Sequence, residues 1–181
     1  GVLMLNKLLK NSKNKVWKEI SDELGGDFED GKFFKESVLR FNFKDWIITL
    51  DTYTVVVGNA SITYTRMRSP FSNKENFYFN LYRENIFSNV RKFFGLQDII
   101  VGDNYFDKKF IIQSNDEEKI RKILNNIKLK ELIQSQPKIS FKIKDDEGWF
   151  GKYFPQGTDE LYFECTGVIK DKIQIINLFK L

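Results

Sequence analysis

Apolar residues recur at helical spacing over the first two dozen positions of the chain. Trp17, Ile20 and Leu24 follow one another at intervals of three and four, with Lys, Glu and Asp between them. Gly25 and Gly26 come next and are typical of a helix end, because glycine adopts the left-handed conformation that terminates helices. The pattern predicts an amphipathic N-terminal helix that buries these three side chains against a sheet, with a candidate interruption at residues 11–14.

Between Asp27 and Arg83 the period of apolar residues changes to two, and β-branched and aromatic residues dominate. The predicted strands are residues 38–43, 46–50, 52–57, 60–68 and 77–83. Gly58 and Asn59 lie between two β-branched runs and predict a tight hairpin turn, whereas residues 69–76 predict a longer connection. This half of the chain is expected to form an antiparallel meander.

The predicted strand 60–68 has two alternating sets of side chains, which face opposite sides of the sheet. We expect Ile62 and Tyr64 to face the core, and Thr63 and Thr65 to face solvent or a second layer. Finding Thr63 more buried than Ile62 would contradict this register.

Helical and strand periods alternate in the second half of the chain. The predicted elements are a helix from Asn85 to Gly95, an irregular link at 96–107, a strand at 108–113, a helix that starts at the capping box 114–117 and runs to Ile127, a second helical piece ending at Pro137, strands at 139–144 and 160–168, and a final helix from Asp171. A loop at 145–158 separates the last two strands.

This order of elements predicts an α+β fold. We expect a mainly antiparallel sheet of about six to eight strands with helices packed on one face, including N- and C-terminal helices. A doubly wound parallel sheet would need a helix after each strand, and the first half has none. Residues 1–181 are expected to form a single domain, with a candidate sub-boundary near 95–107.

Composition and net charge add expectations about partners and cellular location. The chain has 181 residues, 41% hydrophobic with 18 Phe, so it needs no disulfide or metal to fold. Its net charge of +4 permits acidic partners without demanding them. The single cysteine, Cys165, favours a reducing, cytoplasmic location. No apolar run has the length of a transmembrane segment.

The chain lacks the side chains that most catalytic mechanisms require. The chain has no His and one Cys, which excludes Ser-His-Asp and Cys-His catalysis and a zinc cluster. Cys165 lies on a predicted strand face and is interpreted as a small buried hydrophobe. No catalytic residue, cofactor or metal site is therefore predicted.

Carboxylates offer the one remaining route to catalysis. Asp103 and Asp107 flank an aromatic pair, and residues 145–147 are three consecutive acids before Gly148. Two carboxylates can serve as acid and base in a hydrolase. Turn formation and helix capping explain these residues better, because no orienting partner accompanies them.

The candidate binding residues are basic and aromatic. They are Tyr64, Arg66 and Arg68 on one strand face, Arg83 at the end of the next predicted strand, Arg91 and Lys92 on the helix after it, and Trp149 and Phe150 in the later loop. If the two strands pair, guanidinium groups and tyrosines gather in a composition that suits phosphates or carboxylates. The alternative is that these arginines pair with acids, and that the aromatic loop covers the core.

Four stretches carry a resemblance to a known group of proteins. They are WIITLDTY at 46–53, YTRMRSP at 64–70, GDNYFDKKFII at 102–112 and DDEGWF at 145–150. Over most of residues 15–180 the chain resembles an uncharacterised bacterial protein family, a domain of unknown function. The resemblance implies no activity, catalytic residue or cofactor. The scarcity of Ala beside abundant Lys, Asn, Ile and Phe is typical of an A/T-rich genome and fits a bacterial source.

Three function hypotheses follow. The first is a non-catalytic interaction or binding module with an unknown protein partner. The alternative is weak nucleic-acid or anionic-lipid binding through the basic and aromatic residues. The third is a carboxylate-based hydrolase using Asp103, Asp107 or residues 145–147. The sequence favours no particular oligomeric state.

Overall fold

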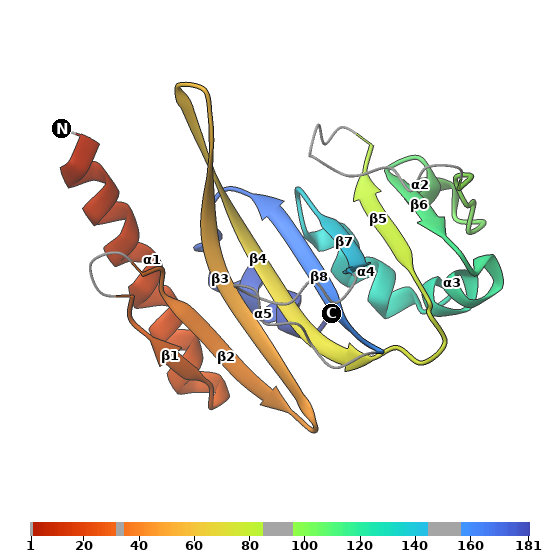
Figure 1. Ribbon diagram of the computed structural model, residues 1–181, viewed down its shortest axis with the longest axis horizontal. Helices are drawn as coiled ribbons and strands as arrows, with labels where there is room; N and C mark the ends of the chain where they lie inside the picture. The colour runs from red at the N-terminus through yellow and green to blue at the C-terminus, as the bar shows by residue number, and fades with distance from the viewer. Residues whose placement is uncertain (1, 32–34, 85–95, 145–156) are drawn as a thin grey trace. The chain divides into compact units, whose positions relative to one another are not determined.

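The computed structural model describes residues 2–31, 35–84, 96–144 and 157–181 (Figure 1). Its described helices are α1 (Val2–Leu24), α2 (Asn104–Asp107), α3 (Glu117–Leu124), α4 (Ile127–Ser135) and α5 (Lys172–Phe179). Its described strands are β1 (Asp27–Glu29), β2 (Val38–Phe43), β3 (Trp46–Val57), β4 (Ala60–Ser72), β5 (Phe79–Arg83), β6 (Phe110–Ser114), β7 (Ser140–Lys144) and β8 (Thr158–Thr166). The eight strands form an antiparallel sheet in the order β1-β2-β3-β4-β8-β7-β5-β6, so the predicted α+β class is confirmed.

The chain divides into two compact units. The first unit comprises Gly1–Arg68 and Cys165–Lys180, and the second unit comprises Ser69–Glu164. The chain passes from one unit to the other within β4 and again within β8. The single-domain hypothesis and its sub-boundary near 95–107 stay predictions.

The N-terminal helix is anchored by its aromatic side chain. Trp17 and Ile20 are fully buried, and the Trp17 indole Nε1 donates a hydrogen bond of 3.1 Å to the carbonyl oxygen of Ile169. Leu24 was expected beside them but is 44% exposed, because it lies in the last turn before Gly25 turns the chain away with a φ of 72°. The predicted burial is therefore right for two of the three side chains.

The expected interruption of this helix at residues 11–14 is wrong. α1 runs without a break from Val2 to Leu24. Asn and Ser cost only a few tenths of a kcal/mol each in a helix. Lys13 offsets that cost, since its Nζ donates to Glu36 Oε2 at 2.9 Å and to Thr52 Oγ1 at 3.0 Å.

Two predicted strands, 46–50 and 52–57, form the single strand β3. Asp51, which lies between the two predicted strands, stays in β3 because Arg66 and Arg68 on β4 bind its carboxylate. The predicted hairpin turn at Gly58 and Asn59 joins β3 to β4, and Gly58 has a φ of 60°. β4 continues through Pro70 to Ser72, so part of the predicted connection at 69–76 is strand.

The predicted register of β4 is wrong. Thr65 is fully buried, Thr63 is half-buried and Ile62 is 36% exposed. Leu50 and Met67 are paired across β3 and β4 and set the core face, which Thr65 shares. Thr65 is tolerated there because its hydroxyl donates to the Gly167 carbonyl at 2.7 Å and accepts from the Ile169 N–H at 3.0 Å.

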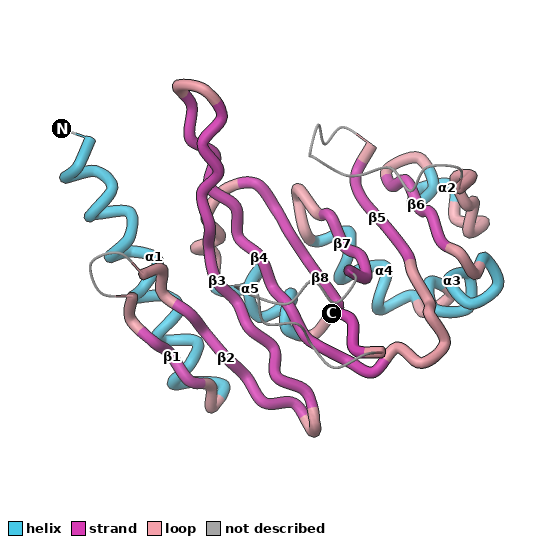
Figure 2. Tube along the Cα trace, viewed as in Figure 1, coloured by secondary structure: helices cyan, strands magenta, loops and turns pink. Residues whose placement is uncertain are grey.

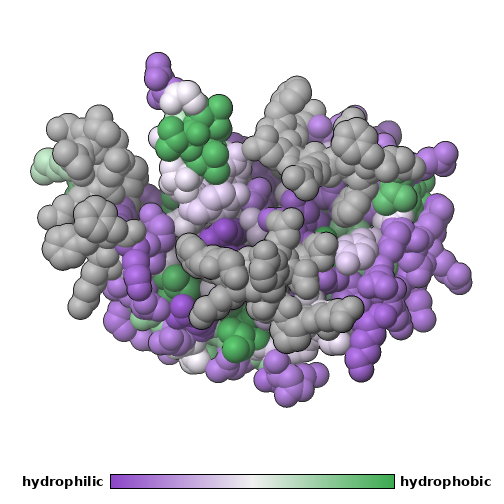
Figure 3. Space-filling view, viewed as in Figure 1, coloured by the Kyte–Doolittle hydropathy of each residue, from purple (hydrophilic) through white to green (hydrophobic). Residues whose placement is uncertain are grey.

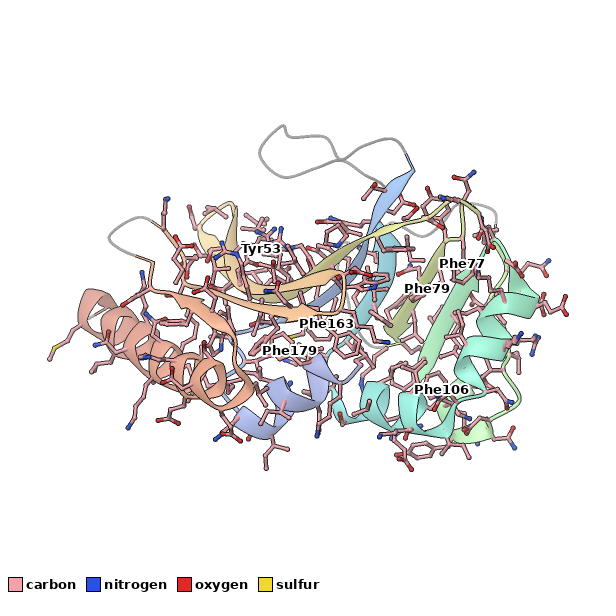
Figure 4. The ribbon with its side chains drawn as sticks, turned by 90° about the horizontal axis from the view of Figure 1, so that it is seen from below. Tyr53, Phe77, Phe79, Phe106, Phe163 and Phe179 are labelled. Carbon is pink, nitrogen blue, oxygen red and sulfur yellow. The ribbon has the colours of Figure 1, made fainter. Side chains whose placement is uncertain are left out.

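The helices of the first unit cover that core face. Phe41 of β2, on the face of Leu39 and Leu50, meets Phe179 of α5 edge-on with ring centroids 4.3 Å apart. Figure 4 shows Phe179 on the helix side of the strands and Tyr53 on the opposite side. Side chains of β3 and β4 that alternate with the core residues therefore lie on the face opposite α1 and α5.

The second unit contains β5 to β7, most of β8, and α2 to α4. Phe79 and Leu81 of β5 and Ile112 of β6 are buried in its core. Phe106 of α2 stacks on Phe110 of β6 with ring centroids 4.5 Å apart, which places the helices on this face (Figure 4). α3 begins within the predicted capping box 114–117, but its N-cap is Asp116, which accepts from the Lys119 N–H at 2.9 Å, and not Ser114.

Three boundaries in this unit differ from prediction. α3 ends at Leu124, and Ile127 begins α4 after the N-cap Asn126. The predicted irregular link at 96–107 contains the short helix α2, which Asp103 caps. The predicted helix from Asn85 to Gly95 lies outside the described residues, as does most of the predicted loop at 145–158.

Candidate functional site

A charged cluster crosses the face of the first unit that lies opposite α1 and α5. Asp51 lies directly opposite Arg66 in the β3–β4 register. The Arg66 Nε donates to Asp51 Oδ1 at 2.7 Å and its second nitrogen donates to Oδ2 at 3.0 Å. Arg68 donates to the same Oδ2 at 2.8 Å. Two guanidinium groups therefore share one buried carboxylate, an arrangement that fixes both donors toward Asp51.

Two tyrosines continue this cluster along the strands. Tyr53 and Tyr64 are also directly opposite each other, and their rings stack at 5.2 Å with an interplanar angle of 17°. The Arg66 guanidinium lies over the Tyr53 ring at 4.6 Å. We refer to Asp51, Tyr53, Tyr64, Arg66 and Arg68 as the Asp51 cluster. Its contacts join the two strands at this point of the sheet.

The structure brings together three of the predicted binding residues, Tyr64, Arg66 and Arg68. Arg83 was expected near them on the condition that its strand pairs with β4. β5 instead pairs with β6 and β7, and Arg83 belongs to the second unit. Arg91, Lys92, Trp149 and Phe150 lie outside the described residues. A binding role for any of these eight residues stays a prediction.

Arg83 has a well-defined structural environment. Its Nε donates to the Gln136 carbonyl at 3.2 Å and a terminal nitrogen donates to the Gln134 carbonyl at 2.8 Å. The guanidinium also lies over the Phe110 ring at 4.9 Å. The two carbonyls belong to the C-terminal end of α4, where helices leave acceptors unpaired. Arg83 thus holds this helix end against the sheet.

The two carboxylates of the hydrolase hypothesis accept backbone hydrogen bonds. Asp103 caps α2 and accepts from the Tyr105 and Phe106 N–H groups at 3.2 and 3.1 Å. Its hydrogen bond with Lys130, together with these backbone bonds, lowers its pKa. Asp107 accepts from the Val101 and Gly102 N–H groups at 2.9 and 3.0 Å. Both act here as turn and cap residues, and residues 145–147 lie outside the described part of the chain.

Beyond the Asp51 cluster, β3 and β4 form a projecting hairpin, residues 54–63, which we call the hairpin arm. β2 pairs with β3 only as far as Leu39 and Leu50, so the arm extends past its neighbouring strand (Figures 1 and 2). Thr54 and Thr63 close its root with a hydroxyl–hydroxyl hydrogen bond of 2.9 Å. The arm is a two-stranded ribbon that continues β3 and β4.

The tip of the hairpin arm is apolar and exposed. Val56 is 71% exposed and Val57 is 59% exposed, and Ile62 adds a further exposed aliphatic side chain. Figure 3 shows this tip as a hydrophobic patch at the end of the projecting hairpin. No charged residue occurs between positions 52 and 65, although 30% of the chain is charged. An exposed apolar, uncharged strand pair is typical of an interaction surface.

The hairpin arm was not among the predicted sites, although the sequence contains a signal for it. Three consecutive valines precede the predicted turn, so both faces of that strand end carry an apolar side chain. A strand covered on one face alone would alternate apolar with polar residues. The lack of apolar–polar alternation and the lack of charged residues together indicate an exposed apolar hairpin at these positions.

None of the described helices combines the length and apolar character needed to cross a lipid bilayer. Within the described residues, no group of three or more His, Cys, Asp or Glu side chains is placed to hold a metal ion. Cys165 is buried, as the sequence predicted. Comparison with protein-family models, with curated proteins and with solved structures finds no match to this chain. The resemblance to an uncharacterised bacterial family therefore gains no support from them.

Proposed function

We propose that the protein is a non-catalytic interaction module that binds a partner protein through the hairpin arm. The observation that carries the proposal is the exposed tip of Val56, Val57 and Ile62 on a hairpin that extends past β2. Burying one such side chain against a partner is favourable by about 1.5 to 3 kcal/mol relative to leaving it in water. A partner that covers the tip would recover this free energy.

The chemistry of the arm defines the partner surface. The arm has no charge, so it matches an uncharged, apolar surface and gains nothing from an acidic or basic one. Residues 54–57 of β3 lie beyond the last β2 pair, so their backbone groups on that side can accept a strand of the partner. We therefore expect a protein with an apolar, exposed sheet edge, which the arm extends.

Rigidity at the root of the arm supports this function. The Tyr53–Tyr64 stack and the Asp51 ion pairs hold β3 and β4 in one register immediately before the arm begins. A preorganised hairpin loses little conformational entropy when it binds. The Asp51 cluster is therefore a support for the arm in this proposal.

Nucleic-acid or anionic-lipid binding receives less support. Arg66 and Arg68 both bind Asp51, so a phosphate would have to compete with a buried carboxylate for their donors. Arg83 donates to two carbonyls. A cytoplasmic location is part of the proposal, because the chain's one cysteine, Cys165, is buried and cannot form an intramolecular disulfide.

Affinity capture with matched baits tests the proposal. The baits are the unchanged protein, the arm variant Val56→Lys with Val57→Lys, and the control Ile127→Lys with Ile173→Lys. Ile127 and Ile173 are as exposed as the valines but lie on helices α4 and α5. A protein retained by the first and third baits is then purified and titrated. We expect the arm variant to weaken its binding at least about tenfold, with far-UV circular dichroism unchanged.

Two results would overturn the proposal. One is a purified partner that binds the arm variant as tightly as the unchanged protein. The other is sedimentation equilibrium in which the chain self-associates through the arm and retains no other protein, which would make a second copy the occupant.

A further inference from the structure

The first turns of α1 carry apolar residues on more than one side of the helix. Residues 2–9 include six apolar residues, with Asn6 and Lys7 as the two polar ones. Met4 is 70% exposed and Leu8 is 57% exposed. A surface helix normally turns its apolar residues toward the core and its polar residues toward water. Met4 and Leu8 do the opposite, so both side chains are available to a partner outside the chain.

Met4 and Leu8 lie on the side of α1 that faces away from the rest of the first unit. Met4 precedes Lys13 by nine residues, and Leu8 precedes Trp17 by the same interval. Nine residues are about two and a half helical turns, so the members of each pair lie on opposite sides of the helix. Lys13 and Trp17 are buried. Figure 1 also shows the first turns of α1 extending past β1 and β2.

The same part of α1 is positively charged. Residues 2–15, which we call the basic segment, contain four Lys and no Asp or Glu. Lys15 is exposed, and Lys10 donates at 2.8 Å to the Gly31 carbonyl oxygen, which carries no net charge. Two acids from outside α1, Asp30 and Glu36, accept hydrogen bonds from the basic segment. The four lysines outnumber these two acids, so an anionic partner is favoured.

Exposed apolar side chains on a basic helix fit the surface of an anionic lipid bilayer. The interface accepts apolar side chains to a depth of about 5 to 10 Å while lysines meet the phosphates. A nucleic acid would use the lysines and leave Met4 and Leu8 in water. A protein groove that binds a helix needs a longer apolar stripe, whereas Asn11 and Lys15 follow Leu8 on this side. A lipid surface needs only the one open side of α1.

We infer that the basic segment binds the surface of an anionic lipid bilayer, with Met4 and Leu8 inserted among the lipid headgroups. Lys15 follows Met4 by eleven residues, about three helical turns, so it lies on the same side of α1 and can contact lipid phosphates. The site uses neither Arg66 nor Arg68, which bind Asp51. It also uses no residue of the hairpin arm, so this inference and the proposed function can fail separately.

Co-sedimentation with vesicles tests the inference. The vesicles are phosphatidylcholine alone and phosphatidylcholine mixed with phosphatidylserine. We expect the chain to bind the mixed vesicles at low salt, and to bind weakly at high salt or without phosphatidylserine. Met4→Gln with Leu8→Gln should weaken binding at least about tenfold, and Lys15→Gln about fivefold. Ile173→Gln and Lys122→Gln are the matched controls at exposed positions of α5 and α3, and should bind like the unchanged protein.

Each other outcome overturns the inference. If the mixed vesicles do not bind, or if phosphatidylcholine alone binds as tightly, the anionic surface is the wrong partner. If the Met4 and Leu8 variant binds as tightly as the unchanged protein, the lipid contacts another part of the chain. If binding is lost instead in Val56→Gln with Val57→Gln, the lipid surface belongs to the hairpin arm. Far-UV circular dichroism verifies that each variant keeps its helices before vesicles are added.

Discussion

Asp51 and Arg66 face each other across β3 and β4, joined by two hydrogen bonds of 2.7 and 3.0 Å. Arg68 adds a third bond to the same carboxylate, and its side chain is only 4% exposed. A single carboxylate thus binds two arginines of one strand face. The hairpin arm begins directly beyond this cluster, so the stability of the cluster and the geometry of the arm are linked.

Replacing Asp51 should therefore be costly. Asp51→Asn removes the negative charge but keeps the size of the side chain, which leaves the buried Arg68 guanidinium without its carboxylate. We expect a loss of about 3 to 5 kcal/mol in the free energy of unfolding, measured by urea denaturation. Asp22→Asn is the control, because the Lys18–Asp22 pair is exposed and should cost under about 1 kcal/mol. Equal losses for both variants would contradict a buried pair.

The Asp51 cluster shows what the sequence could and could not predict. Alternation along the strand correctly placed Tyr64, Arg66 and Arg68 on one face. It could not tell which face meets the helices, because Ile62 and Tyr64 are more apolar than Thr63 and Thr65. The choice depends on Leu50 and Met67, and on backbone groups near Gly167 that are distant in sequence.

The ends of helices and strands were predictable where a nearby residue in the sequence, such as an N-cap, determines them. The N-cap Asp171 starts α5 where expected, and α3 starts within the predicted capping box, two residues later than its first residue, at the N-cap Asp116. In both helices a carboxylate side chain satisfies the first free N–H groups. The continuity of α1 and β3 depends instead on Lys13 and Asp51, whose partners come from other elements. Neither partner can be identified from the spacing of apolar residues.

Trp17 anchors α1, and its truncation should destabilise the protein strongly. The side chain is fully buried and its indole bonds to the Ile169 carbonyl. Trp17→Ala leaves a cavity and an unpaired carbonyl, for which we expect a loss of about 3 to 5 kcal/mol in thermal or chemical unfolding. Trp46→Ala, at a tryptophan of β3 that is 38% exposed, should cost less. A loss under about 1 kcal/mol for Trp17→Ala would show that α1 is only loosely docked.

The Lys13–Glu36 pair should make stability depend on pH in the acid range. Burial raises the pKa of Glu36, but the hydrogen bond and charge of Lys13 outweigh it, so the pKa lies below its ordinary value of 4.5. A lowered pKa in the folded state means that ionised Glu36 stabilises the fold fully above pH 4.5, and that this contribution is lost as pH falls through the folded pKa.

Glu36→Gln measures that contribution. Because Glu36 is half-exposed, we expect a loss of roughly 1 kcal/mol at pH 7, determined by urea denaturation. The difference from the unchanged protein should shrink as pH falls below 4.5 and the native carboxyl becomes protonated. A difference that stays constant over this range would mean that the charge of Glu36 does not contribute.

Asn80→Leu should stabilise the protein. Both polar atoms of the Asn80 amide are buried without partners, and leucine has a similar volume without polar atoms. Removing such groups recovers about 1 to 3 kcal/mol, visible as a higher midpoint of thermal unfolding. Asn73→Leu is the matched opposite, since the Asn73 amide is buried and bonded to Phe77, and this variant should lower the midpoint. Destabilisation by both would indicate that Asn80 is satisfied in solution.

Thr65 tests the register of β4, on which the exposure of Ile62 and of the arm depends. Its hydroxyl joins the Gly167 carbonyl to the Ile169 N–H, and valine has the same shape without the hydroxyl. Thr65→Val leaves both backbone groups without this partner, so the free energy of unfolding should fall by about 1 to 3 kcal/mol. Ile62→Thr makes the reverse exchange at an exposed site and should change it by under about 0.5 kcal/mol. If Ile62→Thr were instead the more damaging variant in urea denaturation, Ile62 would face the core, and the apolar tip proposed to bind a partner would lose one of its three side chains.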